Sequence, residues 1–113
     1  MEVRAVAKNI RRSPQKVRLV VDQVRGRSVR EALAILTLMP HGAARDVYKV
    51  VKSAASNAEN NFEMDADDLY VHRIYVDEGP TLKRFKARSH GRVAPRMRRS
   101  SHITAVVEEK GAQ

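Results

Sequence analysis

The stretch KRFKARSHGRVAPRMRR, residues 83–99, decides how this chain is organised. Its seventeen residues include eight Lys or Arg, no Asp or Glu, and one glycine, Gly91, near the middle. Segments typical of β-strands flank it, 69–76 (LYVHRIYV) before and 102–107 (HITAVV) after. Such a hairpin cannot fold back on the body without crowding like charges. We therefore expect a projecting arm that needs an anionic partner. The alternative is a solvated, flexible run of charge.

The apolar residues of the flanking strands set the length of this arm. They stop at about Val76 and resume at Ile103, so only the base of the hairpin can be buried. With Gly91 at the tip, Val107 would pair near Tyr75, and strand residues that rise about 3.3 Å each predict an arm of about 50 Å. Because an isolated two-stranded ribbon is marginally stable in water, we expect the partner to order the arm.

A short strand at residues 2–8 and a first helix are expected at the start of the chain. Ser13-Pro14 is typical of a helix start, with Ser as the N-cap and Pro at the first helical position. Gly26 is typical of a helix end. One apolar stripe lies between them, formed by Val17, Val20, Val21 and Val24.

Two further helices follow. Ser28 and Glu31 have the spacing of a capping box, and Met39-Pro40 ends the second helix, whose apolar face holds Val29, Leu33 and Leu36. A third helix is predicted over residues 42–60. Its buried stripe is Val47, Val50, Val51, Ala54, Ala55 and Ala58.

The element order β-α-α-α-β-β predicts an α+β fold. Three helices should pack on one side of a small antiparallel sheet from which a long β-hairpin protrudes. With 113 residues, the chain has room for one domain, 1–113. We expect a globular body of residues 1–78 and 102–110 and an extended basic arm of about 79–101, called the arm below.

Composition points to a polyanionic partner. Lys and Arg outnumber Asp and Glu by 22 to 13, which gives a net charge of +9. The absence of Cys excludes disulfides, Cys-ligated zinc and thiol catalysis. With five aromatic residues and no Trp, binding should depend on phosphate contacts and shape more than on base stacking. No apolar run approaches the ~18 residues of a membrane span, so we expect a cytoplasmic protein without membrane contact.

The charge is unevenly distributed along the chain. Residues 4–30 hold nine basic residues against one acid, Asp22, whereas residues 59–68 hold five acids and no base. The chain therefore has two basic zones and one acidic zone. This division suggests that one face is turned away from the polyanion.

No catalytic, metal or cofactor site is predicted. The four histidines lack metal-pair spacing; His72 is expected on a strand surface and His102 to orient backbone at a strand start. Asp65, Asp67 and Asp68 lack the glycine and terminal glutamate of a calcium loop. No phosphate-cradling glycine motif or nucleophile elbow occurs, so an enzyme is not expected.

The run at residues 8–18 has two compatible interpretations. It can be a capped helix with a solvated polar face. It can also be a helix N-terminus that offers backbone N–H groups to a phosphate, surrounded by Arg11, Arg12 and Lys16.

The arm uses Arg six times and Lys twice. Arg binds phosphate with two parallel hydrogen bonds and stacks on bases, which favours ordered RNA contact over loose attraction to a membrane. The apolar residues in this region can insert between bases or pack on sugars, or they can pack across the ribbon. They are Leu82, Phe85, Val93 and Met97.

Four blocks in order resemble the bacterial family of large-subunit ribosomal protein number twenty-two, over nearly the whole chain. Any single block is weaker evidence than the four together at the family's spacing. The blocks are 13–20 (SPQKVRLV) continuing to Arg25-Gly26 and Ala32-Leu33, 52–60 (KSAASNAEN), 76–85 (VDEGPTLKRF), and Arg88 and Gly91-Arg92 with 101–104 (SHIT), Val106 and Val107.

The resemblance implies a structural constituent of the large ribosomal subunit. Such a protein binds large-subunit ribosomal RNA, bridges several RNA domains during assembly, and lines the nascent-peptide exit tunnel with its hairpin. Expected partners are that RNA, neighbouring large-subunit proteins and the nascent polypeptide, without homo-oligomers. The implied tunnel-facing tip is Arg88, Ser89, His90, Gly91 and Arg92. With the cations singled out above, the RNA-binding set is Lys83, Arg84, Lys86, Arg88, Arg92, Arg96, Arg98 and Arg99 on the arm, and Arg11, Arg12, Ser13, Lys16 and Arg18 near the body.

The tip departs from the family pattern, which often reads Pro-Arg-Ala-x-Gly-Arg-Ala. Here Ala87 replaces the first proline and Pro95 appears later, where it removes a backbone donor. Three rival functions remain. A DNA-compacting protein would bind duplex DNA and RNA equally, and a membrane-active protein would need a basic amphipathic helix. An enzyme would need the site that the sequence lacks.

Overall fold

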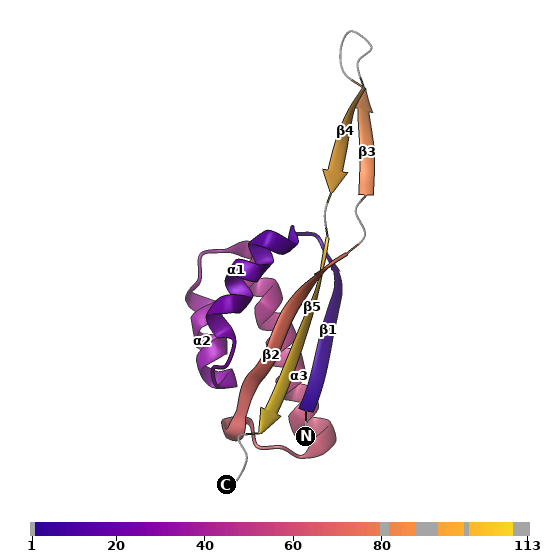
Figure 1. Ribbon diagram of the computed structural model, residues 1–113. Helices are drawn as coiled ribbons and strands as arrows, with labels where there is room; N and C mark the ends of the chain where they lie inside the picture. Colours follow the sequence, from indigo (N-terminus) through magenta and orange to yellow (C-terminus); the bar gives the residue numbers. More distant parts are fainter. Residues whose placement is uncertain (1, 80–81, 88–92, 99, 110–113) are drawn as a thin grey trace.

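A three-stranded sheet drawn from both ends of the chain organises the protein. The computed structural model describes residues 2–79, 82–87, 93–98 and 100–109. The sheet order is β1-β5-β2, and both pairings are antiparallel. In chain order the elements are β1 (Glu2–Ile10), α1 (Pro14–Val24), α2 (Val29–Leu38), α3 (Gly42–Phe62), a 3-10 turn (Ala66–Asp68), β2 (Leu69–Glu78), β3 (Leu82–Ala87), β4 (Val93–Arg98) and β5 (Ser101–Glu109) (Figure 1).

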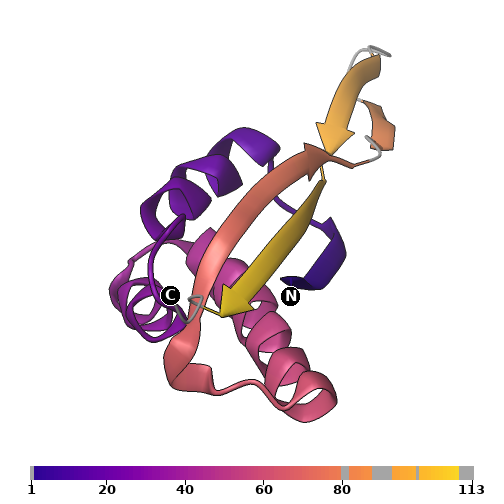
Figure 2. The ribbon, with the colours of Figure 1, turned by 60° about the horizontal axis from the view of Figure 1, so that its bottom comes forward.

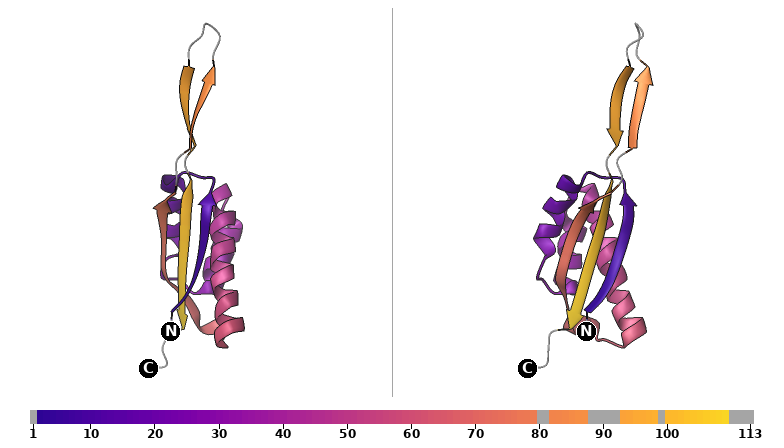
Figure 3. Two further views of the ribbon diagram at one scale, coloured as in Figure 1. Left: turned by 90° about the vertical axis from the view of Figure 1, so that its right-hand side faces the viewer. Right: turned by 45° about the vertical axis from the view of Figure 1, so that its right-hand side comes forward.

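The helices cover one face of this sheet, as Figures 2 and 3 show from further directions. On the central strand β5, all residues from Ile103 to Val107 are buried, and Ile103, Ala105 and Val107 belong to the core cluster. These three share one face of the strand, because successive side chains point to opposite faces. The predicted α+β fold class, with its helices on a small antiparallel sheet, is confirmed.

Helix α3 presents the apolar stripe that the sequence predicts. All six predicted positions are buried, from Val47 to Ala58, and Ala43 and Ala44 extend the stripe toward the N-terminus. Small side chains let the helix lie close to β1 and β5. The helix runs two residues beyond the predicted end and finishes at Phe62, followed by Glu63 in the left-handed conformation at φ 53°.

The first two helices begin as predicted. The Ser13 hydroxyl accepts from the Lys16 N–H at 3.4 Å, and the Ser28 hydroxyl accepts from the Glu31 N–H at 3.2 Å. The capping box of α2 is only half formed, because the Glu31 carboxylate lies 3.6 Å from Arg27. On α2 the buried residues are Val29, Ala32 and Leu36, and the predicted Leu33 is only partly buried.

The predicted register of the hairpin is wrong by four positions at its base. Val107 pairs with Val71, and Tyr75 pairs with Thr104. Two of the four positions arise in the ribbon, where Leu82 pairs with Arg98, two residues short of the partner that a tip at Gly91 would give it. A third arises between the ribbon and the sheet, because the next pair is Glu78 with Ser101. The last is a bulge between Val71 and Arg73, which adds an unpaired residue to β2.

Strands β3 and β4 form a separate two-stranded antiparallel ribbon. The ribbon lies beyond the end of the sheet at which β2 ends and β5 begins, and it makes the molecule long and narrow, 68 × 26 × 19 Å (Figure 1). Strand β1 starts and β5 finishes at the opposite end. Across the described residues, no helix is both long and apolar enough to cross a membrane.

Candidate RNA interface

The loop of residues 11–13, which joins β1 to α1, is fixed to the first residues of β5. The Ser101 hydroxyl donates to the Arg12 carbonyl at 2.6 Å, and the Asn9 N–H donates to Nδ1 of His102 at 3.1 Å. Asn9 has a φ of 58°, a conformation that Asn adopts more readily than most residues. His102 thus orients backbone at a strand start, as predicted. The body's basic loop and the base of the arm are therefore held as one unit.

Arg12 is held against the start of α3. Its Nε donates to Oδ2 of Asp46 at 2.6 Å, although the side chain remains 43% exposed. The guanidinium lies against Gly42, where an added Cβ would sit 2.8 Å from its terminal nitrogens. The predicted RNA contact Arg12 therefore has a structural partner as well, and its terminal nitrogens lie against Gly42.

Arg18 is also tied to the body. Its Nη2 donates to the Val76 carbonyl at 3.1 Å, and Arg25, two turns further along α1, donates to the Ile74 carbonyl at 2.9 and 3.3 Å. Both carbonyls belong to β2, an edge strand of the sheet. The two arginines cover part of an edge that would otherwise offer unpaired groups to another chain. The sequence analysis did not foresee this role.

Two predicted body contacts are free of internal partners. The side chains of Arg11 and Lys16 are exposed and form no ion pair with any described residue. Ser13 is occupied as the N-cap of α1. Among the five predicted body residues, Arg11 and Lys16 are thus the most available to an anion.

The described part of the arm is the β3–β4 ribbon. Neighbouring cross-strand pairs lie on opposite faces of such a ribbon. The register sets Leu82 opposite Arg98, Arg84 opposite Arg96 and Lys86 opposite Ala94. The two strands together hold five cations and no acid, namely Lys83, Arg84, Lys86, Arg96 and Arg98. The predicted contacts Arg88, Arg92 and Arg99 and the predicted tip residues 88–92 lie outside the described residues.

Pro95 lies within β4, opposite Phe85. In a two-stranded ribbon each strand has a free edge, and proline is tolerated where its missing N–H would point outward. The departure from the family pattern at this position is therefore compatible with strand pairing.

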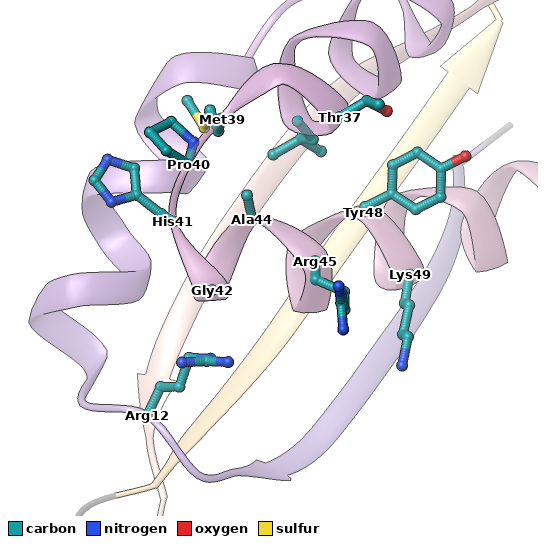
Figure 4. A pocket seen from close by; sticks show the side chains of 11 residues that line it. Arg12, Thr37, Met39, Pro40, His41, Gly42, Ala44, Arg45, Tyr48 and Lys49 are labelled. Carbon is teal, nitrogen blue, oxygen red and sulfur yellow. The ribbon is translucent and has the colours of Figure 1, made fainter.

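A further group of cations surrounds the connection between α2 and α3. A cavity of about 830 Å³ opens there, and Arg12, Arg45 and Lys49 line it together with Met39 and Tyr48, among others (Figure 4). The sequence analysis did not single out Arg45 or Lys49. Arg45 and Lys49 are four residues apart on the predicted third helix, which places both on one face. This spacing could have indicated a cationic pair.

One cluster combines possible metal ligands. His72 on β2 lies between two carboxylates, with Nε2 3.9 Å from Glu2 and Nδ1 3.5 Å from Glu108. The three ligand atoms lie within 4.8 Å of one another. Both carboxylates already have other partners, since Arg73 pairs with Glu2 and the Tyr70 hydroxyl donates to Glu108 at 3.5 Å. Glu2 and Glu108 lie far from His72 in sequence, and strand pairing brings the three together.

Tyr70 adjoins this cluster, with its hydroxyl 3.2 Å from Nδ1 of His72. Burial raises the pKa of the Tyr70 phenol above its ordinary value, and the charge and hydrogen bond of Glu108 raise it further.

Acidic residues gather at the other end of the molecule from the ribbon. The turn that precedes β2 holds Asp65, Asp67 and Asp68, and Asp67 pairs with Arg30. Because this turn and the ribbon lie at opposite ends of the sheet, charge is separated along the long axis (Figure 1).

Fold and charge together define the class: a small basic α+β domain with a cationic two-stranded ribbon that projects from its sheet. The family model for ribosomal protein L22p/L17e matches residues 5–108. The chain belongs to this ribosomal protein family.

Curated relatives match along nearly their whole length. A large ribosomal subunit protein uL22 from Clostridium novyi (strain NT) is 56% identical over 110 residues, which cover 97% of this chain and 99% of that protein. A protein of the same name from Thermomicrobium roseum is 50% identical over 115 residues, which cover 99% of this chain and 98% of that protein. The predicted family is thereby confirmed.

Proposed function

We propose that this protein is a structural constituent of the large ribosomal subunit that binds large-subunit ribosomal RNA. It holds several RNA segments together during assembly, and its arm lines the nascent-peptide exit tunnel. Membership of the L22p/L17e family supports the first part, as do relatives that are named large-subunit proteins. The protein acts in the cytoplasm as part of the ribosome, without catalysis.

One observation carries the proposal: the ribbon extends away from the body and is built from two strands that hold five cations and no acid. Like charges at this density repel one another, and phosphates relieve that repulsion. The body supplies a second contact region through Arg11, on the loop that is fixed to the start of β5, and Lys16, in the first turn of α1. Two contact regions on one protein can hold two RNA segments together.

The proposed RNA contacts follow from this arrangement. On the arm they are Lys83, Arg84, Lys86, Arg88, Arg92, Arg96, Arg98 and Arg99, and on the body Arg11, Arg12, Ser13, Lys16 and Arg18. The segment 88–92 is proposed to face the tunnel and the nascent polypeptide. Neighbouring large-subunit proteins are further partners.

Sedimentation tests the proposal. Tagged protein from a lysate of its own cells is run through a sucrose gradient in high salt, as the intact chain and with residues 83–99 deleted. We expect the intact chain to co-migrate with large ribosomal subunits, and the deletion then separates anchoring by the arm from anchoring by the body. Migration with the chromosome, or release as free protein when salt rises, would contradict the ribosomal assignment.

A further inference from the structure

Two adjoining hollows meet at the connection between α2 and α3. The first, about 830 Å³, lies between the end of α2 and the start of α3, and the second, about 650 Å³, lies between α1 and the same connection. Both are lined by Arg12 and by residues 39–42. These two hollows, which share five lining residues, are together called the connection groove below. Each half has the size of pockets that hold molecules as large as a nucleotide.

The groove is cationic. Arg12, Lys16, Arg45 and Lys49 line it, and no carboxylate does so among the described residues. The nearby acid, Asp46, is engaged by Nε of Arg12 at 2.6 Å. Figure 4 shows Arg45 and Lys49 extending in the same direction from α3. A ligand in this groove therefore meets several positive charges without an opposing negative one.

The guanidinium of Arg12 is held in place before any ligand binds. Asp46 fixes the guanidinium through Nε, and the absence of a side chain at Gly42 gives it room. Nη1 and Nη2 have no hydrogen-bond partner among the described residues, at the place where the two hollows meet. A guanidinium already held in position loses less side-chain entropy when it binds phosphate.

The floor of the groove is apolar. Leu36 and Ala44 are buried beneath it, Met39 and Tyr48 are partly buried, and Leu19 is 68% exposed at one margin. Lys52 lies over the Tyr48 ring at 5.8 Å from its centroid. Cations around an apolar floor match a chain of phosphates that carries flat rings and sugars.

We propose that the connection groove binds a segment of ribosomal RNA, with Arg12, Arg45 and Lys49 on its phosphates and the apolar floor against its sugars and bases. This inference rests on the proposed function and adds a contact surface on the body that includes two residues outside the predicted set, Arg45 and Lys49. Charge complementarity selects RNA as the occupant. An acidic protein segment is the other candidate, which the experiment distinguishes.

The test compares two full-length variants with the same charge change. Arg45→Gln/Lys49→Gln alters the groove, and Arg27→Gln/Arg30→Gln alters two exposed arginines at the start of α2. Binding to in vitro transcribed large-subunit RNA from the same organism is measured over a series of salt concentrations. The groove variant should bind roughly tenfold more weakly, with a salt slope shallower by about 1.5 to 2, and the control should change the slope by less than about 0.5.

Each outcome decides the matter. Equal effects of the two double variants overturn the groove site, whereas the proposed function stands as long as the unaltered protein binds the RNA. Failure of the unaltered protein to bind contradicts the proposed function itself. Unchanged RNA affinity with lost incorporation into subunits would assign the groove to a protein and overturn the RNA site. Circular dichroism checks folding, and the single variant Lys49→Gln serves if the double variant is unstable.

Discussion

The hydroxyl of Ser101 donates a 2.6 Å hydrogen bond to the backbone carbonyl of Arg12, although 89 positions separate the two residues. Ser101 is fully buried at the first position of β5, directly where the ribbon joins the sheet. The contact fixes the basic loop to the base of the arm. One buried hydroxyl and one backbone carbonyl thus join the basic loop to the first residue of β5.

Replacing Ser101 with Ala should lower the free energy of unfolding by about 1–3 kcal/mol, because the Arg12 carbonyl loses its donor in a buried place. Urea denaturation of the isolated protein measures the change. Ser53→Ala is the matched control, since Ser53 is exposed on α3 and its replacement should alter stability by less than about 0.5 kcal/mol. Equal effects of the two changes would refute the role of Ser101.

Gly26 and Glu63 should respond in opposite directions to substitution. Gly26 has a φ of 81° after α1, and Glu63 has a φ of 53° after α3. Gly26→Ala should destabilise the protein by about 1 kcal/mol, whereas Glu63→Gly should stabilise it by up to about 1 kcal/mol. Thermal unfolding of both variants checks the pair, and a shift of both midpoints in the same direction would contradict this account.

Gly42→Ala should lower RNA affinity while it leaves the free energy of unfolding nearly unchanged. The new Cβ would meet the Arg12 guanidinium at 2.8 Å, but that group is the end of a flexible side chain and can move away. Because alanine also favours the helix, we expect the unfolding free energy to change by less than about 1 kcal/mol. RNA affinity should fall, since Arg12 leaves the position that Asp46 holds. Wild-type affinity in a well-folded variant would show that the position of Arg12 does not matter.

Neutralising cations of the ribbon should reduce the salt dependence of RNA binding. If the arm neutralises about five phosphates of duplex RNA, the logarithm of the binding constant should fall against that of salt concentration with a slope of about −4.5. Arg84→Gln/Arg96→Gln should make this slope shallower by about 1.5 to 2.

Filter binding over a salt series measures the slope. Arg27→Gln/Arg30→Gln again provides the same charge change away from the arm. A slope shallower than about −1 for the unaltered protein on its cognate RNA would contradict the phosphate-based mechanism.

The Tyr70 phenol should ionise at a higher pH than a free tyrosine, and this should make the stability of the protein depend on pH in the alkaline range. Burial and the Glu108 carboxylate raise the pKa of the folded-state phenol above the unfolded value of about 10. The resulting stabilisation is fully present below pH about 10 and is lost as pH rises through the folded-state pKa. Tyr70→Phe should remove this dependence.

Spectrophotometric titration of phenolate absorbance follows the group directly. We expect one of the three tyrosines to ionise late in the unaltered protein, and this phase should be missing in Tyr70→Phe. Tyr75→Phe is the control and should retain the late phase. A late phase that survives in Tyr70→Phe would overturn the assignment.

Local signals were enough to predict most elements. Ser13-Pro14 and Ser28 start their helices because a short hydroxyl side chain caps backbone N–H groups within three residues. The six-residue stripe of α3 is buried because apolar periodicity and burial obey the same helical geometry. His102 was predicted to orient backbone, and it accepts from Asn9.

Long-range relationships required the tertiary structure. The register between β2 and β5 departs from the prediction because a bulge between Val71 and Arg73 and the β3–β4 pairing each displace it, and neither leaves a local signal. Arg18 and Arg25 read as surface cations, yet they donate to carbonyls of an edge strand.

The sequence by itself determined the family, the charge, the helices and the existence of a basic hairpin, since each depends on residues close together in the chain or on composition. Only the tertiary structure decided which cations remain available. It pairs Arg12 with Asp46 across 34 positions, leaves Arg11 and Lys16 exposed, and brings Arg45 and Lys49 to a groove. Partner choice for a long charged side chain depends on what the fold places within about 3–4 Å, and no local pattern encodes that distance.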